Sequence, residues 1–158
     1  MSTSTLLNYL EENVSAETSN RSKTETLIAN GTIAEGQAVA LDLTKTGTNR
    51  ALYCVAADTG SPNTILCVGI ATHAAVAGEN VNVVVGGYYA KANVHASTVA
   101  GDMLLISGVA GQLLKRATQV VESGSATVLL YPVVAIALED DSAVTNVAAV
   151  FVMNNAFM

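Results

Sequence analysis

Hydrophobic residues recur along most of this chain in short runs that are separated by turn-forming residues. From Leu27 onward the chain is rich in Val, Ala and Gly, and no later segment shows the 3.6-residue period of a helix. Short apolar runs at close spacing predict an all-β fold, either a compact β-barrel or a β-sandwich-like domain. The expected strands lie within Gln37–Leu43, Leu52–Ala57, Ile65–Ala71, Val81–Val85, Met103–Ile106, Gln112–Leu114, Thr127–Ala137 and Val147–Met153.

A small glycine-containing unit recurs before three of these runs. In each copy Gly stands where a positive φ is needed, and an apolar run follows at once. The unit predicts compact β-turns without catalytic meaning. Its copies are Ala34–Gln37, Ala77–Asn80 and Ala100–Met103.

Two segments of the chain align with each other without gaps. Val68–Val85 and Val134–Phe151 both follow an order of strand, polar loop and strand. Two readings stay open here: the chain contains two equivalent hairpins, or a sequence so rich in Val and Ala matches itself by chance.

The first 28 residues differ in composition from the rest, because they are rich in Ser, Thr, Glu and Asn. Within them Ser4 is placed to cap a short helix over residues 5–12, with Leu6, Leu7 and Leu10 on one face. The sequence therefore predicts a polar N-terminal arm with a short helix over residues 1–28, followed by a β-rich domain over residues 29–158.

After the predicted helix, Ser15–Thr26 contains few apolar residues to offset the entropy of ordering. One interpretation is a frayed terminus, and the other is an arm that becomes ordered on a partner. The leucine stripe favours the second interpretation, since a solitary tail seldom needs three leucines on one side.

Composition narrows the classes of function. Charged residues make up 13% of the 158 residues, compared with about 25% in typical globular domains. We therefore expect a partner chain to cover part of the surface. The aromatic content of 4%, with no Trp, disfavours an enzyme pocket or a sugar-binding platform. The net charge of −6 disfavours nucleic-acid binding, which needs a basic face.

The N-terminus lacks the basic and apolar regions of a signal peptide, and no apolar run approaches the roughly 20 residues of a membrane helix. We therefore expect synthesis in a cytoplasm and no membrane partner. Cys54 and Cys67 could pair across neighbouring strands, but in apolar surroundings without secretion we favour buried free thiols.

Few residues suggest chemistry. His73 and His95 stand alone and match no metal-ligand spacing, although a Cys67–His73 pair is conceivable. Glu139–Asp141 is the densest acidic cluster, but it lacks the alternating spacing that folds carboxylates around one cation. The glycine-rich segments Gly86–Tyr89 and Gly108–Gly111 are read as turns, because strands rather than helices follow them. We expect no cofactor, no metal and no enzymatic activity.

Several turn and strand segments follow one another in a recognisable order: Ala29–Asp42, Val68–Ala71, Ala77–Val83, Gly86–Tyr88, Gly101–Leu104 and Gly111–Leu113. In this order, residues 29–158 resemble the small β-domain capsid decoration proteins of tailed bacteriophages, also called cement or head-stabilising proteins. These motifs are turn-and-strand patterns, and the polar arm is not part of the resemblance.

The resemblance implies a structural virion protein on the outer capsid surface, commonly a homotrimer at three-fold or quasi-three-fold positions. Its partners would be the major capsid protein and other copies of itself, and it would clamp capsomers of the mature head. The arm would contact the capsid through Leu6, Leu7, Leu10, Thr26, Leu27 and Ile28.

Two other hypotheses stay open. The chain could be the base of a head fibre or adhesin that binds a host-surface glycan. It could also be a small hydrolase that uses the acidic cluster Glu139–Asp141, although no carboxylate pair is marked out by aromatic neighbours.

Overall fold

The computed structural model describes residues 22–62, 64, 66–116, 132–141 and 146–153. These residues form nine strands and one short 3-10 helix, η1 (Gly47–Ala51). Within the described ranges, no helix is long and apolar enough to cross a bilayer. The strands are β1 (Lys23–Ala29), β2 (Ala38–Leu41), β3 (Tyr53–Ala56), β4 (Cys67–Ala71), β5 (Asn80–Asn93), β6 (Met103–Ile106), β7 (Leu113–Lys115), β8 (Ala135–Ala137) and β9 (Val147–Val152).

The first five strands close into a barrel, which confirms the predicted all-β, barrel-like fold. Around the ring the order is β1-β3-β2-β4-β5, and β5 pairs again with β1. All neighbours are antiparallel except β1 and β3, which run parallel. Closure leaves none of these strands with an unpaired edge.

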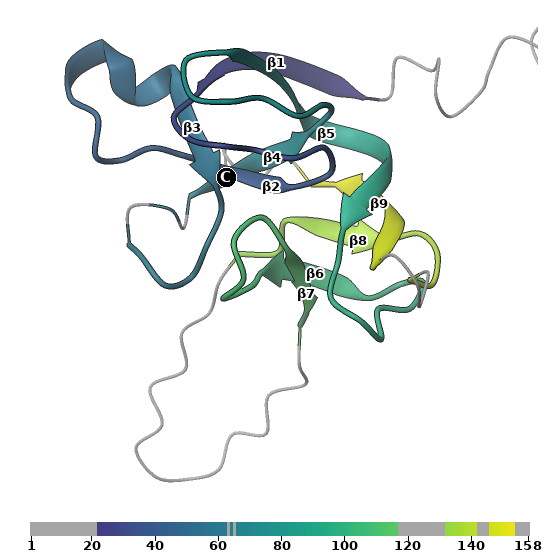
Figure 1. Cartoon of the computed structure of the whole chain (residues 1–158). Coiled ribbons are helices and arrows are strands. Elements are labelled where there is room, and N and C mark those ends of the chain that lie inside the picture. The colour runs from purple at the N-terminus through teal and green to yellow at the C-terminus, as the bar shows by residue number, and fades with distance from the viewer. Residues whose placement is uncertain (1–21, 63, 65, 117–131, 142–145, 154–158) are drawn as a thin grey trace, which may run out of the picture.

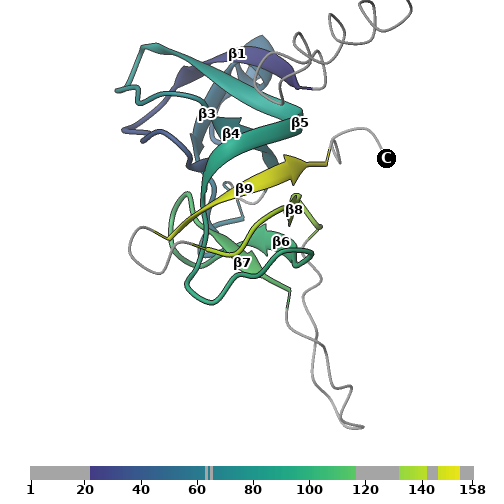
Figure 2. The ribbon, with the colours of Figure 1, turned by 90° about the vertical axis from the view of Figure 1, so that its right-hand side faces the viewer.

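The remaining strands form a second ring with the end of β5 (Figure 1). The order is β5-β9-β8-β6-β7. The ring closes through a parallel bridge between Val94 and Leu113, where the His95 N–H also donates to the Leu113 carbonyl over 2.7 Å. Figure 2 shows β5 running from one group of strands into the other, so that this strand belongs to both barrels.

The two barrels are copies of one unit. The first half of β5 in the first barrel corresponds to β9 in the second, and β1 corresponds to the second half of β5. The register is conserved as well. The cross-strand pair of Ala38 with Ile70 matches the pair of Met103 with Ile136. In the same way, the pair of Ala40 with Val55 matches that of Leu105 with Leu114, and the pair of Ala29 with Cys54 matches that of Val94 with Leu113.

The internal alignment noted in the sequence is therefore a true structural repeat, and it is part of a longer one. Its two segments form the antiparallel hairpins β4–β5 and β8–β9. The second hairpin has one more residue between its paired positions, since Ile70 faces Val84 whereas Ile136 faces Phe151. The gapless alignment therefore matched Val84 with Val150, whereas the residue equivalent to Val84 in the structure is Phe151.

Each barrel has an apolar interior built from equivalent positions. Leu27, Val39 and Val83 fill the first barrel. Ala92 and Leu104 stand at the positions of Leu27 and Val39 in the second barrel and lie in the other core cluster. At one position the repeat changes character, because the buried Thr98 stands where the first barrel has the buried Ile33.

The second barrel packs against outward-facing residues of the first. The tip of the β6–β7 hairpin inserts beside β2, where the Ala38 N–H donates to the Gly111 carbonyl and the Gly111 N–H donates to the Ala57 carbonyl, both over 2.8 Å. Ala38 and Ala57 belong to the same hydrophobic cluster as the interior of the second barrel. The outward face of the first barrel and the interior of the second therefore form one hydrophobic cluster, while the interior of the first barrel forms a separate one.

The three predicted glycine turns form at Ala34–Gln37, Val76–Glu79 and Val99–Asp102, the last two one residue earlier than expected, and the turn read at Gly108–Gly111 forms as a fourth of the same kind over Val109–Gln112. The third residue of each turn is a Gly with positive φ, at positions 36, 78, 101 and 111. In the first three turns, the side chain of the fourth residue accepts a hydrogen bond from the first residue's N–H. These bonds are Ala34 N to Gln37 Oε1 at 2.9 Å, Val76 N to Glu79 Oε2 at 3.0 Å and Val99 N to Asp102 Oδ2 at 3.0 Å.

Strand β1 corrects the predicted division of the chain. The boundary expected after residue 28 falls inside β1, whose residues pair with both β3 and β5. The strand looked like a polar arm because Lys23–Thr26 are exposed, and only Leu27 and Ala29 are buried. The predicted helix over residues 5–12 and its leucines lie outside the described residues.

The reading of Gly86–Tyr89 as a turn was wrong, because these residues continue β5. Gly86 pairs with Lys23 of the first barrel, and Gly87, with a φ of 98°, pairs with Val152 of the second. The glycine pair is therefore the point at which β5 passes from one barrel into the other.

Candidate functional site

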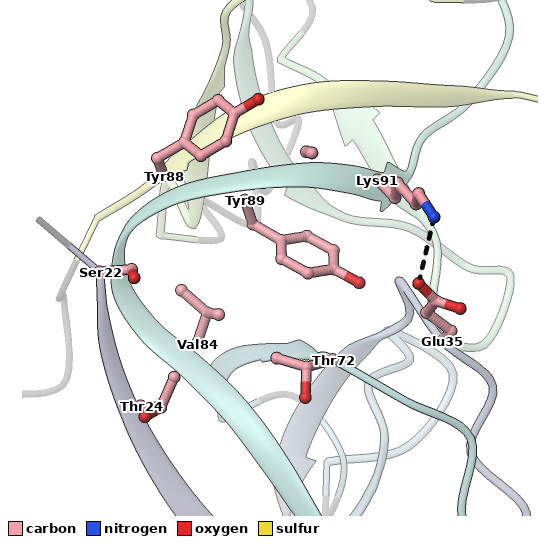
Figure 3. A pocket seen from close by; sticks show the side chains of 9 residues that line it. Ser22, Thr24, Glu35, Thr72, Val84, Tyr88, Tyr89 and Lys91 are labelled. Carbon is pink, nitrogen blue, oxygen red and sulfur yellow. Dashed lines mark ion pairs between the residues drawn. The ribbon is translucent and has the colours of Figure 1, made fainter. Parts of the chain in front are cut away.

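A pocket of about 290 Å³ lies where β5 curves between the barrels (Figure 3). Hydroxyl groups, the Tyr89 ring and one ion pair surround it, while the Tyr88 ring lies on the other side of the β5 ribbon (Figure 3). The described residues that line it are Ser22, Thr24, Glu35, Thr72, Val84, Tyr88, Tyr89, Ala90 and Lys91.

Tyr89 is the most unusual side chain of this pocket. Its ring points toward Glu35 and Thr72 (Figure 3), and its hydroxyl is buried without a hydrogen-bond partner among the described residues. Burial, together with the nearby Glu35 carboxylate, raises the pKa of Tyr89 to about 12. The phenol is therefore a neutral donor that a bound polar group could satisfy.

The charged groups of the pocket neutralise each other. The Lys91 ammonium lies 3.7 Å from a Glu35 carboxylate oxygen, and both side chains are exposed. Glu35 is the single carboxylate among the described lining residues. One paired carboxylate does not supply the two-carboxylate arrangement of glycoside cleavage. An aromatic face with nearby hydroxyls is instead suited to holding a small polar molecule.

The residues predicted to contact a capsid differ in how far the described fold buries them. Leu6, Leu7 and Leu10 lie outside the described residues. Thr26 is exposed, and its hydroxyl donates to the Asn82 side chain over 2.8 Å. Ile28 is half-buried. Leu27 belongs to the interior of the first barrel, so the expectation that its side chain contacts a partner is wrong.

Two carboxylates of the acidic cluster accept hydrogen bonds from backbone amides. A Glu139 oxygen accepts the Ala149 N–H over 2.7 Å, and an Asp140 oxygen accepts the Ala100 N–H over 2.9 Å. One Asp141 oxygen is buried without a partner among the described residues. In the described ranges, no group of three or more potential ligands is arranged to hold a metal ion.

The histidines and cysteines do not form a reactive pair. The exposed His73 ring lies within hydrogen-bonding distance of the Thr72 hydroxyl and the Asn80 carbonyl, while the Cys67 thiol is directed at the Gly69 carbonyl. Cys54 and Cys67 are free thiols, as the sequence favoured, but only Cys54 is buried, and Cys67 is half-buried. Burial raises their pKa to about 11 for Cys54 and about 12 for Cys67.

An apolar row crosses the outer face of the second barrel. Tyr88, Phe151, Ile136 and Met103 stand on four adjacent strands, and each is paired with the next. Beside the row, Leu105 on β6 faces Leu114 on β7. We call these six residues the second-barrel row. Sequence reasoning missed this surface, because the alternation within each run was visible but the order of the strands was not.

The comparisons with known proteins concern mainly the fold. No family model and no curated protein matches the chain. Among solved structures, it is similar to the N base of the head fiber gp8.5 of bacteriophage phi29, with a TM-score of 0.52 and 14% identity. The match covers 84% of this chain and 95% of that chain. A match of this extent takes in both barrels, so the similarity concerns the two-barrel arrangement.

Proposed function

We propose that this chain is a structural protein of a bacteriophage head, which binds the outer capsid surface and stabilises the mature head without catalysing a reaction. The observation that carries the proposal is the two-barrel fold shared with the phi29 head fiber base. The sequence resemblance to phage decoration proteins, which is independent of that comparison, supports the same class.

The side chains of the described residues are consistent with a structural role. Glu139 and Asp140 hold backbone amides, and the thiols of Cys54 and Cys67 stay protonated at neutral pH. The protein would act as a homotrimer at three-fold or quasi-three-fold positions, with the major capsid protein as its partner. Repetition over a lattice would multiply weak contacts.

Co-sedimentation with phage heads that lack the protein tests the proposal, with mature and immature heads in parallel. We expect saturable, stoichiometric binding to mature heads, and a gain in their resistance to heat or chelators. Absence of binding to both kinds of head would overturn the proposal.

A second function is favoured by the pocket at the bend of β5. The Tyr89 ring, with the hydroxyls of Thr24 and Thr72, forms a lining that suits a sugar, and the structural neighbour is the base of a head fiber. In this case the chain would be a fibre or adhesin base that binds a host-surface glycan.

Calorimetry with host-surface polysaccharide separates the two functions. Glycan binding predicts a saturable heat that Tyr89→Ala abolishes. Val76→Ala, which alters an exposed side chain outside the pocket, should leave that heat unchanged. A glycan array without any hit would remove this second function.

A further inference from the structure

The internal repeat allows each surface of the second barrel to be compared with its equivalent on the first. On the first barrel, Ala38, Ile70 and Val84 stand side by side on β2, β4 and β5, and each is paired with the next. They point away from that barrel's interior, yet their exposed fractions are 0%, 0% and 3%. They are buried because the second barrel packs on them.

The equivalent residues of the second barrel are Met103, Ile136 and Phe151, in matching strand positions. Here the side chains are larger, but Met103 is 51% exposed and Phe151 is 44% exposed. In the part of the chain that the structure describes, nothing covers them as the second barrel covers the first. Tyr88 and the Leu105–Leu114 pair extend this exposed apolar surface.

We propose that the second-barrel row is the surface through which one copy of this protein packs against another. The inference rests on the proposed function for the association of copies, and it adds the residues at which they meet. On the first barrel, the structure shows what covers a row of this kind, namely a barrel of the same fold. A second copy supplies such a barrel.

The chemistry of the row also favours a second copy as its occupant. None of its six residues is charged, so two copies can bury it without desolvating an unpaired ion. Large exposed apolar patches of this kind mark interaction sites on globular proteins. Aromatic residues and Met, which the row contains in Tyr88, Phe151 and Met103, are enriched at the centres of interfaces.

Analytical ultracentrifugation of the full chain over a range of concentrations tests this inference. We expect the wild-type protein to form a discrete oligomer, and Phe151→Lys to shift it to the monomer without changing its circular dichroism. Met103→Lys provides a second variant on another strand of the row. Val76→Lys is the matched control, since Val76 is 54% exposed but lies in a turn outside the row.

Two results would overturn the inference. The first is a wild-type protein that stays monomeric up to its solubility limit. The second is an oligomer that persists unchanged in both lysine variants. In the first case, an unfolding midpoint that falls in both variants would show that another part of the same chain covers the row.

Binding to heads separates this inference from the proposed function. If both hold, the monomeric variants should bind mature heads roughly tenfold or more weakly than the wild type, through loss of multivalency. An oligomeric wild type that binds no heads would overturn the proposed function and leave the interface standing.

Discussion

Leu27 illustrates how a residue in a polar stretch can be essential to the fold. Its neighbours Lys23–Thr26 are exposed, but its own side chain is 7% exposed and packs inside the first barrel. In an edge-free barrel, only alternate residues of a strand need to be apolar. For a single residue, burial of its side chain, and not the composition of the surrounding sequence, determines how much it contributes to the stability of the fold.

Truncation of Leu27 should therefore cost stability. We expect Leu27→Ala to lower the free energy of unfolding by about 2–4 kcal/mol, because a cavity forms in the barrel interior. Thr26→Ala is the neighbouring control and should change it by less than about 1 kcal/mol. Urea unfolding followed by circular dichroism measures both. Equal stability of Leu27→Ala and the wild type would show that the strand is not packed as described.

The two thiols give a second prediction at this scale. Their pKa values rise from 9.0 to about 11 for Cys54 and about 12 for Cys67, because burial disfavours the thiolate. We expect neither thiol to react with a disulfide reagent at pH 8 until the protein is unfolded by urea. Rapid labelling of Cys54 in the native protein would contradict its burial, and rapid labelling of the half-buried Cys67 would contradict its raised pKa.

The same shifts make stability depend on alkaline pH. The unfolded chain loses these protons near pH 9, whereas the folded chain holds them to about pH 11 and 12. Their contribution is fully present below pH 9, and it is lost as the pH rises toward the folded values. Urea midpoints measured from pH 8 upward should fall over this interval.

Among the elements, the glycine turns are the most regular feature. Each precedes a strand, has a positive φ at its third residue and is closed by a backbone hydrogen bond. Three of them add a bond from the side chain of the fourth residue. Their local pattern explains why they were visible in the sequence.

Gly36 and Gly101 stand at equivalent positions of the two barrels. Replacing each by Ala separates the stability lost through backbone strain in the turn from the stability lost through a steric clash. At Gly36, an added Cβ would lie 2.2 Å from the Lys91 carbonyl oxygen of β5, whereas at Gly101 it would meet nothing within 4 Å. Both have positive φ, at 81° and 90°. We expect Gly101→Ala to cost about 1–2 kcal/mol from backbone strain alone, and Gly36→Ala to cost clearly more. Thermal unfolding of the pair checks this, and equal losses would argue against close packing at Gly36.

For the molecule as a whole, β5 is the strand on which the two barrels depend. Its first half closes the first barrel with β1, and its second half has the role of β1 in the second barrel. The shared strand, and the cluster in which the first barrel's outward face packs against the second barrel's interior, join the repeats more firmly than a flexible linker would.

Truncation at two points tests the closure of the first barrel. A chain that begins at Ser22 keeps β1 and should unfold in one cooperative transition. A chain that begins at Ala29 lacks most of β1, so β3 and β5 lose a neighbour; we expect a lower melting temperature and exposed strand edges that promote aggregation. Equal melting temperatures for the two truncated chains would show that β1 does not contribute to closure.

Much of this protein could be inferred from local patterns in the chain. Apart from the second half of β5, the strands after Ala29, the glycine turns and the free thiols depend on neighbouring residues or on composition, and they were predicted. A turn such as Val76–Glu79 is closed by bonds within four residues, so its signal is contiguous.

The remaining features depend on pairing between distant residues. Leu27 faces Val81, and the pocket at the bend of β5 forms only when Thr24, Glu35 and Tyr89 meet. Val84 and Phe151 are both apolar, and no local signal tells which is covered. Packing of one barrel on the other buries Val84 and leaves Phe151 exposed, so this difference arises only in the tertiary structure.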